Sequence, residues 1–213
     1  MKVTKLGHCC LIIEVGGKRL LTDPGNFTSG YDAVSEIDIV LITHEHADHL
    51  HIPALKQVLE QSPQAKVVAN SAVGKLLQAE SIPHELLEGL ANTDCCGVKL
   101  TAHDAKHEEI YEDFGQVQNT GYFIAEKLFY PGDSFAVPTY HVPVLALPVA
   151  GPWCKVGDAV RYALQVKPDK AFPVHDGMLV EGRVGSVHAV PHKVLNESGI
   201  DFVPLGPGQS AEF

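Results

Sequence analysis

Three histidines and one aspartate lie within six consecutive residues, in the segment His44-Glu45-His46-Ala47-Asp48-His49. Neutral imidazoles and carboxylates are good ligands for Zn, Mn and Fe. His44 and His46 are two residues apart and can point at one metal ion, while Asp48 and His49 can emerge from the following turn toward a second. The alternative is a solvated polar loop, but unpaired polar groups beside apolar strands are costly. The segment therefore predicts a metal centre.

This segment must be positioned by the chain that precedes it. Ile37 to Thr43 is a short apolar run, with the length expected of a strand covered on both faces. It leads directly into His44. We therefore expect the metal-binding segment to be a loop at the end of a buried strand.

Short strands and a few helices account for the rest of the chain. Further strands are expected at Val3 to Leu6, Cys9 to Val15, Arg19 to Thr22, Lys66 to Ala69, Val98 to Ala102, Gln118 to Ala125, Lys127 to Tyr130, Val144 to Leu147 and Lys170 to Val174, with a short one at the end of the chain. Helices are expected from Pro53 to about Gln61, from a cap at Ser71 to about Ala79, from Gly157 to before Pro168, and from about Pro191 to Ser198.

Two strand-rich halves, each with helices that can cover an outer face, predict an α/β fold arranged as a four-layer α/β/β/α sandwich. A doubly wound parallel sheet is the alternative, but the opening strands lack crossover helices. No internal repeat or linker divides the chain, so residues 1–213 are expected to form one domain.

Composition excludes several classes of partner. The chain has 16 basic and 26 acidic residues and a formal charge of -10, which argues against binding a nucleic-acid backbone. The longest apolar stretch, Val142 to Trp153, contains three prolines and is shorter than the ~20 residues of a membrane-spanning helix. We therefore expect a small-molecule substrate, no nucleic acid and no membrane.

The cysteines and the N-terminus indicate the compartment. The five cysteines are odd in number and show no C-x-x-C spacing, so free thiols in a reducing compartment are expected. The early apolar run is broken by Gly7 and His8 and stopped by Glu14, unlike a signal peptide. A cytoplasmic location follows as the expectation. Cys154, in a Gly-Pro-Trp-Cys loop, is an alternative nucleophile.

The segment Thr43 to His49 resembles the signature motif of the metallo-β-lactamase superfamily, and other segments follow in the family's order. Thr22-Asp23-Pro24-Gly25 resembles the first motif, whose aspartate usually supports the metal loop. Tyr130-Pro131-Gly132-Asp133-Ser134 is similar to the motif whose carboxylate bridges both metals. Phe172-Pro173-Val174-His175 resembles the strand that ends in the last ligand of the second metal. The resemblance thus assigns these roles to Asp23, Asp133 and His175.

The segment from Val98 to His107 resembles the strand that supplies the third histidine of the first metal. This points to His107, with His103 as the alternative. The first metal would then be held by His44, His46 and His107. The second would be held by Asp48, His49 and His175, and the two metals would share Asp133.

Within the superfamily, Leu6-Gly7-His8, Leu147 to Gly151 and Pro173-Val174-His175 look like the compact single-domain branch that includes the L-ascorbate-6-phosphate lactonase-like proteins. The chain departs from that pattern at Ala150-Gly151, where a double glycine is common, and at His103-Asp104. The resemblance implies the metallo-β-lactamase fold and does not identify a substrate. Association into a homo-oligomer is common for this fold.

The expected activity is hydrolysis of a small ester, lactone or phosphodiester. Two divalent metal ions, zinc before manganese or iron, would convert a bridging water into hydroxide and polarise the substrate. Turnover should then depend on Asp48 and Asp133. The alternatives are a diiron redox enzyme and a non-catalytic metal-binding protein.

The remaining polar residues have weaker assignments. His8 is expected either in the core or in the pocket, and His141 and Asp176 are candidates for pocket lining. The histidines expected at the surface are His51, His84, His188 and His192.

Overall fold

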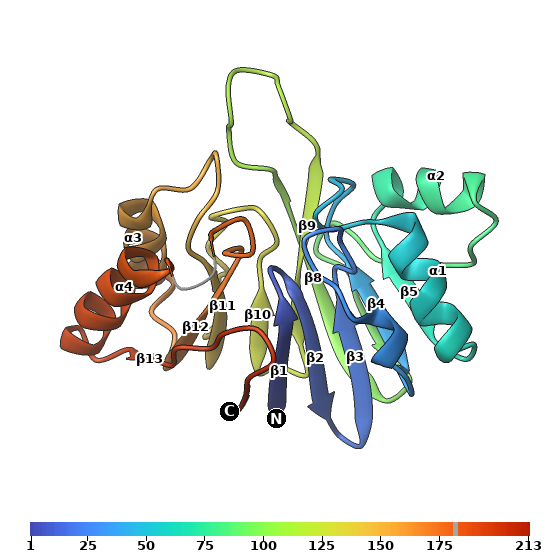
Figure 1. Cartoon of the computed structure of the whole chain (residues 1–213), viewed down its shortest axis with the longest axis horizontal. Coiled ribbons are helices and arrows are strands. Elements are labelled where there is room, and N and C mark those ends of the chain that lie inside the picture. The colour runs from blue at the N-terminus through green and yellow to red at the C-terminus, as the bar shows by residue number, and fades with distance from the viewer. Residues whose placement is uncertain (181–182) are drawn as a thin grey trace.

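The computed structural model describes residues 1–180 and 183–213. Within that part of the chain two seven-stranded sheets pack face to face, with helices on both outer faces (Figure 1). The expectation of a four-layer α/β/β/α sandwich is therefore confirmed. No helix of these residues is long and apolar enough to cross a bilayer.

The first sheet comes from the N-terminal half and the last strand. In spatial order it contains β14 (Ser210–Glu212), β1 (Lys2–Gly7), β2 (Cys10–Val15), β3 (Lys18–Thr22), β4 (Ile39–Ile42), β5 (Lys66–Ala69) and β6 (Glu85–Leu86). The second sheet contains β13 (Asp201–Phe202), β12 (Lys170–Val174), β11 (Val144–Pro148), β10 (Leu128–Tyr130), β9 (Gln118–Ile124), β8 (Val98–Lys106) and β7 (Asn92–Cys95).

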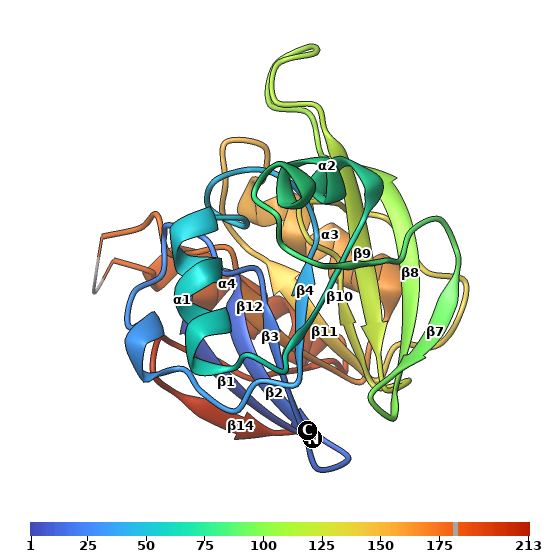
Figure 2. The ribbon, with the colours of Figure 1, turned by 90° about the vertical axis from the view of Figure 1, so that its right-hand side faces the viewer.

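Helices cover the outer face of each sheet. Helices α1 (Ile52–Gln61) and α2 (Ser71–Ala79) pack on the first sheet and face the viewer in Figure 2. Helices α3 (Val156–Val166) and α4 (Gly185–Glu197) pack on the second, and a short 3-10 helix, η1 (Tyr31–Ala33), precedes β4. The core between the sheets includes Leu11, Ile13 and Leu41 from the first sheet and Tyr122 and Phe172 from the second.

Parallel strands bring the loops that carry the candidate metal-binding residues to one edge of the sandwich. β3, β4 and β5 run parallel to one another, as do β10, β11 and β12. Loops after the carboxyl ends of parallel strands lie at a common edge of their sheet, where ligands generally bind. Asp23, His44, Asp133 and His175 come soon after β3, β4, β10 and β12, respectively. The edge of the sandwich thus collects residues from both halves of the chain.

Several local expectations need correction. The cap of α2 is Asn70 rather than Ser71, because the Asn70 side chain accepts a hydrogen bond from the Val73 N–H over 3.0 Å. The last helix begins at Gly185 rather than near Pro191, and Pro191 lies buried inside it. Strands β6 and β7 were not predicted, because neither contains a run of apolar residues.

The connection between β8 and β9 is a hairpin that projects away from the sandwich, at the top of Figures 1 and 2. Near its tip a β-bridge joins Tyr111 and Phe114, which are 68% and 74% exposed. His107 lies at the base of this hairpin, directly after β8. The hairpin therefore rises from the edge at which the strand-end residues gather.

Candidate metal centre

Asp133 is the point on which the predicted ligands converge. Its Oδ2 lies 2.9 Å from His175 Nε2, 3.2 Å from His107 Nε2 and 3.8 Å from His44 Nε2. Its Oδ1 lies 3.1 Å from His49 Nε2. A carboxylate in this position can be shared between two metal ions.

The histidines fall into two groups on either side of Asp133. His44, His46 and His107 form one group, in which the candidate ligand atoms lie within 4.8 Å of one another. In the other group, Asp48 Oδ2 lies 3.6 Å from His175 Nε2 and 3.8 Å from His49 Nε2. The structure therefore brings together all seven residues predicted to bind metal.

The second nitrogen of four histidines is held by a neighbouring oxygen. His49 Nδ1 lies 2.7 Å from Asp23 Oδ2, while His107 and His175 Nδ1 each lie 2.6 Å from a backbone carbonyl. Thr43 Oγ1 gives its proton to Asp23 and so accepts from His44 Nδ1 over 3.0 Å. These contacts place a proton on each Nδ1, so that Nε2 is the nitrogen available at the centre, the usual arrangement in metal sites.

Asp23 anchors the loop that carries the six-residue segment from His44 to His49. Its carboxylate accepts hydrogen bonds from the Thr43 N–H at 2.8 Å, the Thr43 hydroxyl at 2.7 Å and the Tyr130 hydroxyl at 2.6 Å. Gly25 packs closely against the same loop, since a Cβ there would lie 1.7 Å from the Asp48 carbonyl oxygen. Aspartate and glycine in the early motif thus hold the loop in place without facing the centre.

Unpaired buried atoms at the centre fit a bound cation. Among the described residues, His44, His49 and His175 each have a buried Nε2 without a hydrogen-bond partner, and Asp133 Oδ1 is also unpartnered. Buried polar atoms nearly always have a partner, so four such atoms in one place call for an explanation. Imidazole nitrogen and carboxylate oxygen are suitable donors for Zn, Mn or Fe, and coordination would satisfy all four.

In the metal-free cluster the histidines differ in the direction in which their pKa values are shifted. Burial lowers the pKa of His44 well below its ordinary value, and His49 adds to this effect. Burial would also lower the pKa of His49, but the carboxylates of Asp133 and Asp23 together outweigh it, and that pKa lies well above the ordinary value. Burial would raise the pKa of Asp133, but His175, His49 and His44 together hold it well below the usual range. Asp133 is therefore an anion.

His103 and His107 have different surroundings. The His103 ring lies 5.6 Å from that of Phe129 and 6.4 Å from that of Tyr140, measured between centroids. The His107 ring lies 4.6 Å from that of His46. The structure thus brings His107 to the cluster and places His103 elsewhere.

Sequence reasoning missed Trp153. Its indole Nε1 donates a hydrogen bond to Asp133 Oδ2 over 3.0 Å, and its ring lies 5.7 Å from that of His107 and 5.3 Å from that of His175. The available signal was the position of the chain's one tryptophan, two residues after Gly151. Trp153 therefore orients the carboxylate that lies next to both groups of candidate ligands.

His8 is a buried residue of the site. Its Nδ1 accepts a hydrogen bond from the Gly177 N–H over 3.1 Å, so the proton of the neutral ring is on Nε2, 3.1 Å from Asp48 Oδ2. Burial lowers the pKa of His8 to about 4. A neutral His8 thus fixes the orientation of Asp48.

Other polar residues differ from expectation. His188 is half-buried and lies 2.7 Å from Asp176 Oδ2, rather than at the surface. His51 and His84 are also half-buried, and His192 is exposed as expected. His141 is exposed and pairs with Asp169, so it does not line the centre. Burial raises the pKa of Cys154 to about 12, which argues against its use as a nucleophile.

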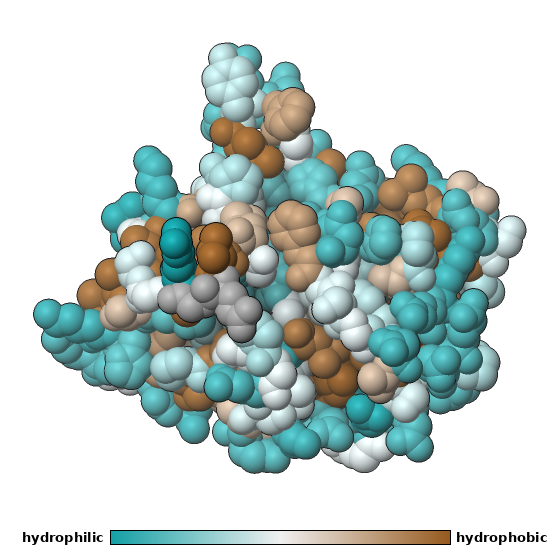
Figure 3. Space-filling model, in the orientation of Figure 1, coloured by the Kyte–Doolittle hydropathy of each residue, from teal (hydrophilic) through white to brown (hydrophobic). Residues whose placement is uncertain are grey.

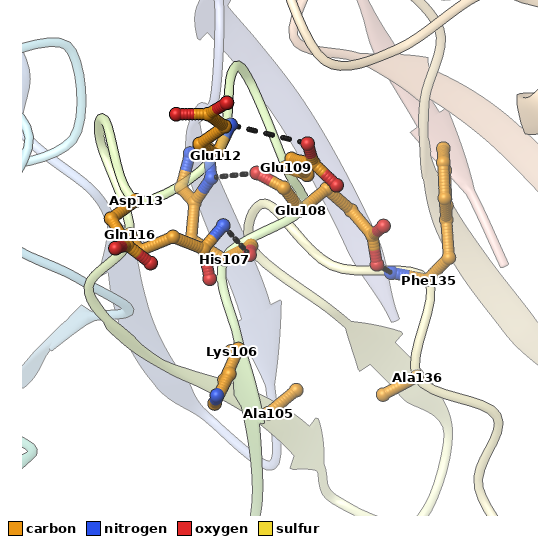
Figure 4. A pocket seen from close by; sticks show the side chains of 10 residues that line it. All are labelled: Ala105, Lys106, His107, Glu108, Glu109, Glu112, Asp113, Gln116, Phe135 and Ala136. Atoms are coloured by element: carbon orange, nitrogen blue, oxygen red, sulfur yellow. Dashed lines mark hydrogen bonds between the residues drawn. The ribbon is translucent and has the colours of Figure 1, made fainter.

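An acidic cavity of about 430 Å³ opens beside His107 (Figure 4). Glu108, Glu109, Glu112 and Asp113 line it, and Glu108 Oε1 accepts a hydrogen bond from the Phe135 N–H over 2.9 Å. The acidic cavity thus adjoins the group formed by His44, His46 and His107.

The comparisons with known proteins agree on one family. A family model described as a beta-lactamase superfamily domain matches residues 2–175. Protein Rv0786c of Mycobacterium tuberculosis is 31% identical over 219 residues, covering 95% of this chain and 100% of that protein. A UPF0173 metal-dependent hydrolase of Polaromonas sp. is 26% identical, covering 100% of this chain and 89% of that protein. The structure of Igni18, a metallo hydrolase from the archaeon Ignicoccus hospitalis, shares the fold with a TM-score of 0.78 at 20% identity, covering 100% of this chain and 98% of that one.

Proposed function

The chain belongs to the beta-lactamase superfamily, and from this membership we propose that it is a metal-dependent hydrolase with a pair of divalent metal ions. His44, His46 and His107 would hold the first ion, Asp48, His49 and His175 would hold the second, and Asp133 would bind both. We propose further that residues 1–213 act as one domain and that zinc is the resident metal.

One observation carries this proposal, the convergence of four buried unpartnered atoms, three imidazole Nε2 atoms and Asp133 Oδ1. His49 Nε2 and Asp133 Oδ1 lie 3.1 Å apart without forming a hydrogen bond, whereas a purely structural polar cluster would join such atoms by hydrogen bonds or bond them to the backbone. When bound, two metal ions supply Lewis acidity and lower the pKa of a water molecule enough for hydrolysis at neutral pH.

The protein's own residues organise this chemistry. Trp153 donates to Asp133 and His8 donates to Asp48, so each carboxylate has a fixed orientation before substrate arrives. Asp23 holds the His49 ring through Nδ1. Such partners raise metal affinity and activity because the ligands need not reorganise.

The substrate class proposed is a small ester, lactone, thioester or phosphodiester. A protein nucleophile is not needed, which agrees with the buried, protonated thiol of Cys154. The formal charge of -10 disfavours a nucleic acid as the substrate.

Metal analysis of the purified protein, combined with a turnover screen of lactones, thioesters and phosphodiesters, tests the proposal. We expect close to two metal ions per chain and metal-dependent hydrolysis of at least one class, lost on chelation and restored by added zinc or manganese. Iron with redox turnover would favour the diiron alternative. Two bound metals without hydrolysis of any class would favour a non-catalytic metal-binding protein.

A further inference from the structure

A cavity of about 500 Å³ lies against His8, outside the metal-binding cluster. Its apolar lining comes from four separate parts of the chain, namely Leu6 at the end of β1, Phe27, Leu179 with Val184, and Pro207. We call this space the His8 cavity. A volume of this size is typical of pockets that take a small molecule.

The His8 cavity is next to the second group of metal ligands. His8 contacts Asp48 through Nε2 at 3.1 Å and Gly177 through Nδ1 at 3.1 Å. Asp176 and Gly177, which directly follow the ligand His175, form part of the cavity wall. His8 therefore lies between this cavity and Asp48, with one hydrogen bond joining it to the second group of candidate ligands.

Exposed hydrophobic side chains occur in the cavity lining and next to it in the sequence. Phe27 is 46% exposed and lies edge-on to His8, with ring centroids 5.2 Å apart. Met178 and Val180, on either side of the cavity residue Leu179, are 39% and 63% exposed. Figure 3 shows hydrophobic (brown) and hydrophilic (teal) side chains next to one another on this face of the molecule. Clustered apolar side chains around a hollow are typical of a binding site.

The charged residue Asp176 and the Thr28 hydroxyl, both in the cavity wall, are already paired. Asp176 is buried, with Oδ1 2.6 Å from Lys5 Nζ and Oδ2 2.7 Å from His188 Nε2. Lys5 also donates to the Pro173 carbonyl at 2.9 Å, and the Thr28 hydroxyl donates to the Gly7 carbonyl at 3.0 Å. The charge of Asp176 is balanced by Lys5, and among the described residues that line the cavity none is a lysine or arginine that could pair with a phosphate or carboxylate. Its lining suits an uncharged apolar group.

We infer that the His8 cavity binds the acyl chain or aromatic ring of the substrate, while the carbonyl to be hydrolysed lies at the metal centre. This inference rests on the proposed function and narrows it from esters in general to esters, thioesters or lactones with an apolar acyl group. It disfavours sugar phosphates and phosphodiesters, whose charged groups would find no partner in this cavity.

Chain-length selectivity tests the inference. We expect kcat/KM for an octanoyl thioester to exceed that for the butyryl thioester by about tenfold or more, because the longer chain buries additional methylene groups. Leu179→Trp fills the cavity and should reduce this preference to about twofold or less. The matched control is Leu90→Trp, at a side chain that is 75% exposed and does not line the cavity, and it should keep the wild-type preference.

Binding without turnover separates this inference from the proposed function. Calorimetry of the metal-loaded protein with octanoate and butyrate should show tighter binding of octanoate, lost in Leu179→Trp. That result would support the cavity's role even if no ester were hydrolysed. Val184→Trp repeats the test if Leu179→Trp does not fold by circular dichroism. Hydrolysis without chain-length preference, or a preference unchanged in a folded cavity-filling variant, would overturn the inference.

Discussion

The indole Nε1 of Trp153 and Oδ2 of Asp133 form a buried hydrogen bond of 3.0 Å. Asp133 is the carboxylate on which both groups of candidate ligands converge. The bond joins the chain's single tryptophan to the centre, and the two residues are twenty positions apart. Metal binding should therefore be visible in the intrinsic fluorescence of the protein.

Addition of zinc to the metal-free protein should change the emission of Trp153, because the charge next to its indole changes. Trp153→Phe should weaken metal binding by about tenfold, as is typical when a partner of a metal ligand is removed. The affinity of this variant is measured by competition with a coloured chelator. An unchanged affinity would mean that the indole bond does not orient Asp133.

Metal stoichiometry distinguishes the two histidines of the segment from Val98 to His107, His103 and His107. His107→Ala should empty or weaken the first site, because its Nε2 lies 3.2 Å from Asp133 Oδ2. His103→Ala should leave close to two metals per chain, because its ring packs against Phe129 and Tyr140. The reverse pattern in elemental analysis would show that His107 is wrongly assigned.

Removal of either central carboxylate should abolish turnover while the protein stays folded. Asp133→Ala removes the group shared by both sites, and Asp48→Ala removes the only carboxylate specific to the second. Asp169→Asn is the matched control, because Asp169 forms an exposed pair with His141 away from the centre. Full activity of both alanine variants, measured with the best substrate of the screen, would refute the assigned centre.

The number of protons released on metal binding should differ between the two sites. His49 has a pKa raised well above its ordinary value by Asp133, so in the metal-free protein it is protonated at pH 7 and must lose that proton to bind metal. His44 and His46 have lowered pKa values because of burial, so they are already neutral at that pH. Binding at the second site alone should therefore weaken as the pH falls from 8 to 6.

Calorimetry in two buffers of different ionisation enthalpy measures these protons directly. We expect the second metal to release about one proton more than the first at pH 7. His49→Ala should remove the proton release together with the second binding event. Equal release at both steps would contradict the charge assignment of His49.

Lys5 and Asp176 form a fully buried ion pair, and breaking it should cost stability. Lys5→Met leaves Asp176 buried with His188 as its one remaining side-chain partner among the described residues, which should lower the free energy of unfolding by about 3 kcal/mol. Lys66→Met breaks a pair of nearly the same length, 2.7 Å to Glu85, but an exposed one, so it should change stability little. Urea unfolding of the metal-loaded proteins compares the two, and equal effects would show that burial is not what matters here.

The expected four-layer sandwich followed from the sequence because local patterns determine it. The apolar run ending at Thr43 reads as a covered strand, and β4 is indeed buried throughout. The segment from His44 to His49 is also a local pattern, because closely spaced residues that follow a strand must emerge at the same edge of the sheet. Where local signals were weak the expectations were wrong, as for the two short edge strands and for the start of α4, which Pro191 does not interrupt.

The choice between His103 and His107 required the tertiary structure. Both stand in the same motif, but His103 is within β8 and faces Phe129, whereas His107 follows the strand and turns toward His46. Spacing alone does not decide which residue lies beyond the end of the strand.

By itself the sequence determined the kind of chemistry, because a dense set of imidazoles and carboxylates has few uses other than binding metal. Only the tertiary structure decided what surrounds that chemistry. Trp153 reaches Asp133 across 20 residues, His8 reaches Asp48 across 40, and Lys5 reaches Asp176 across 171. Such contacts form because the packing of the two sheets brings distant strand ends together, and no periodicity along the chain records which of them will meet.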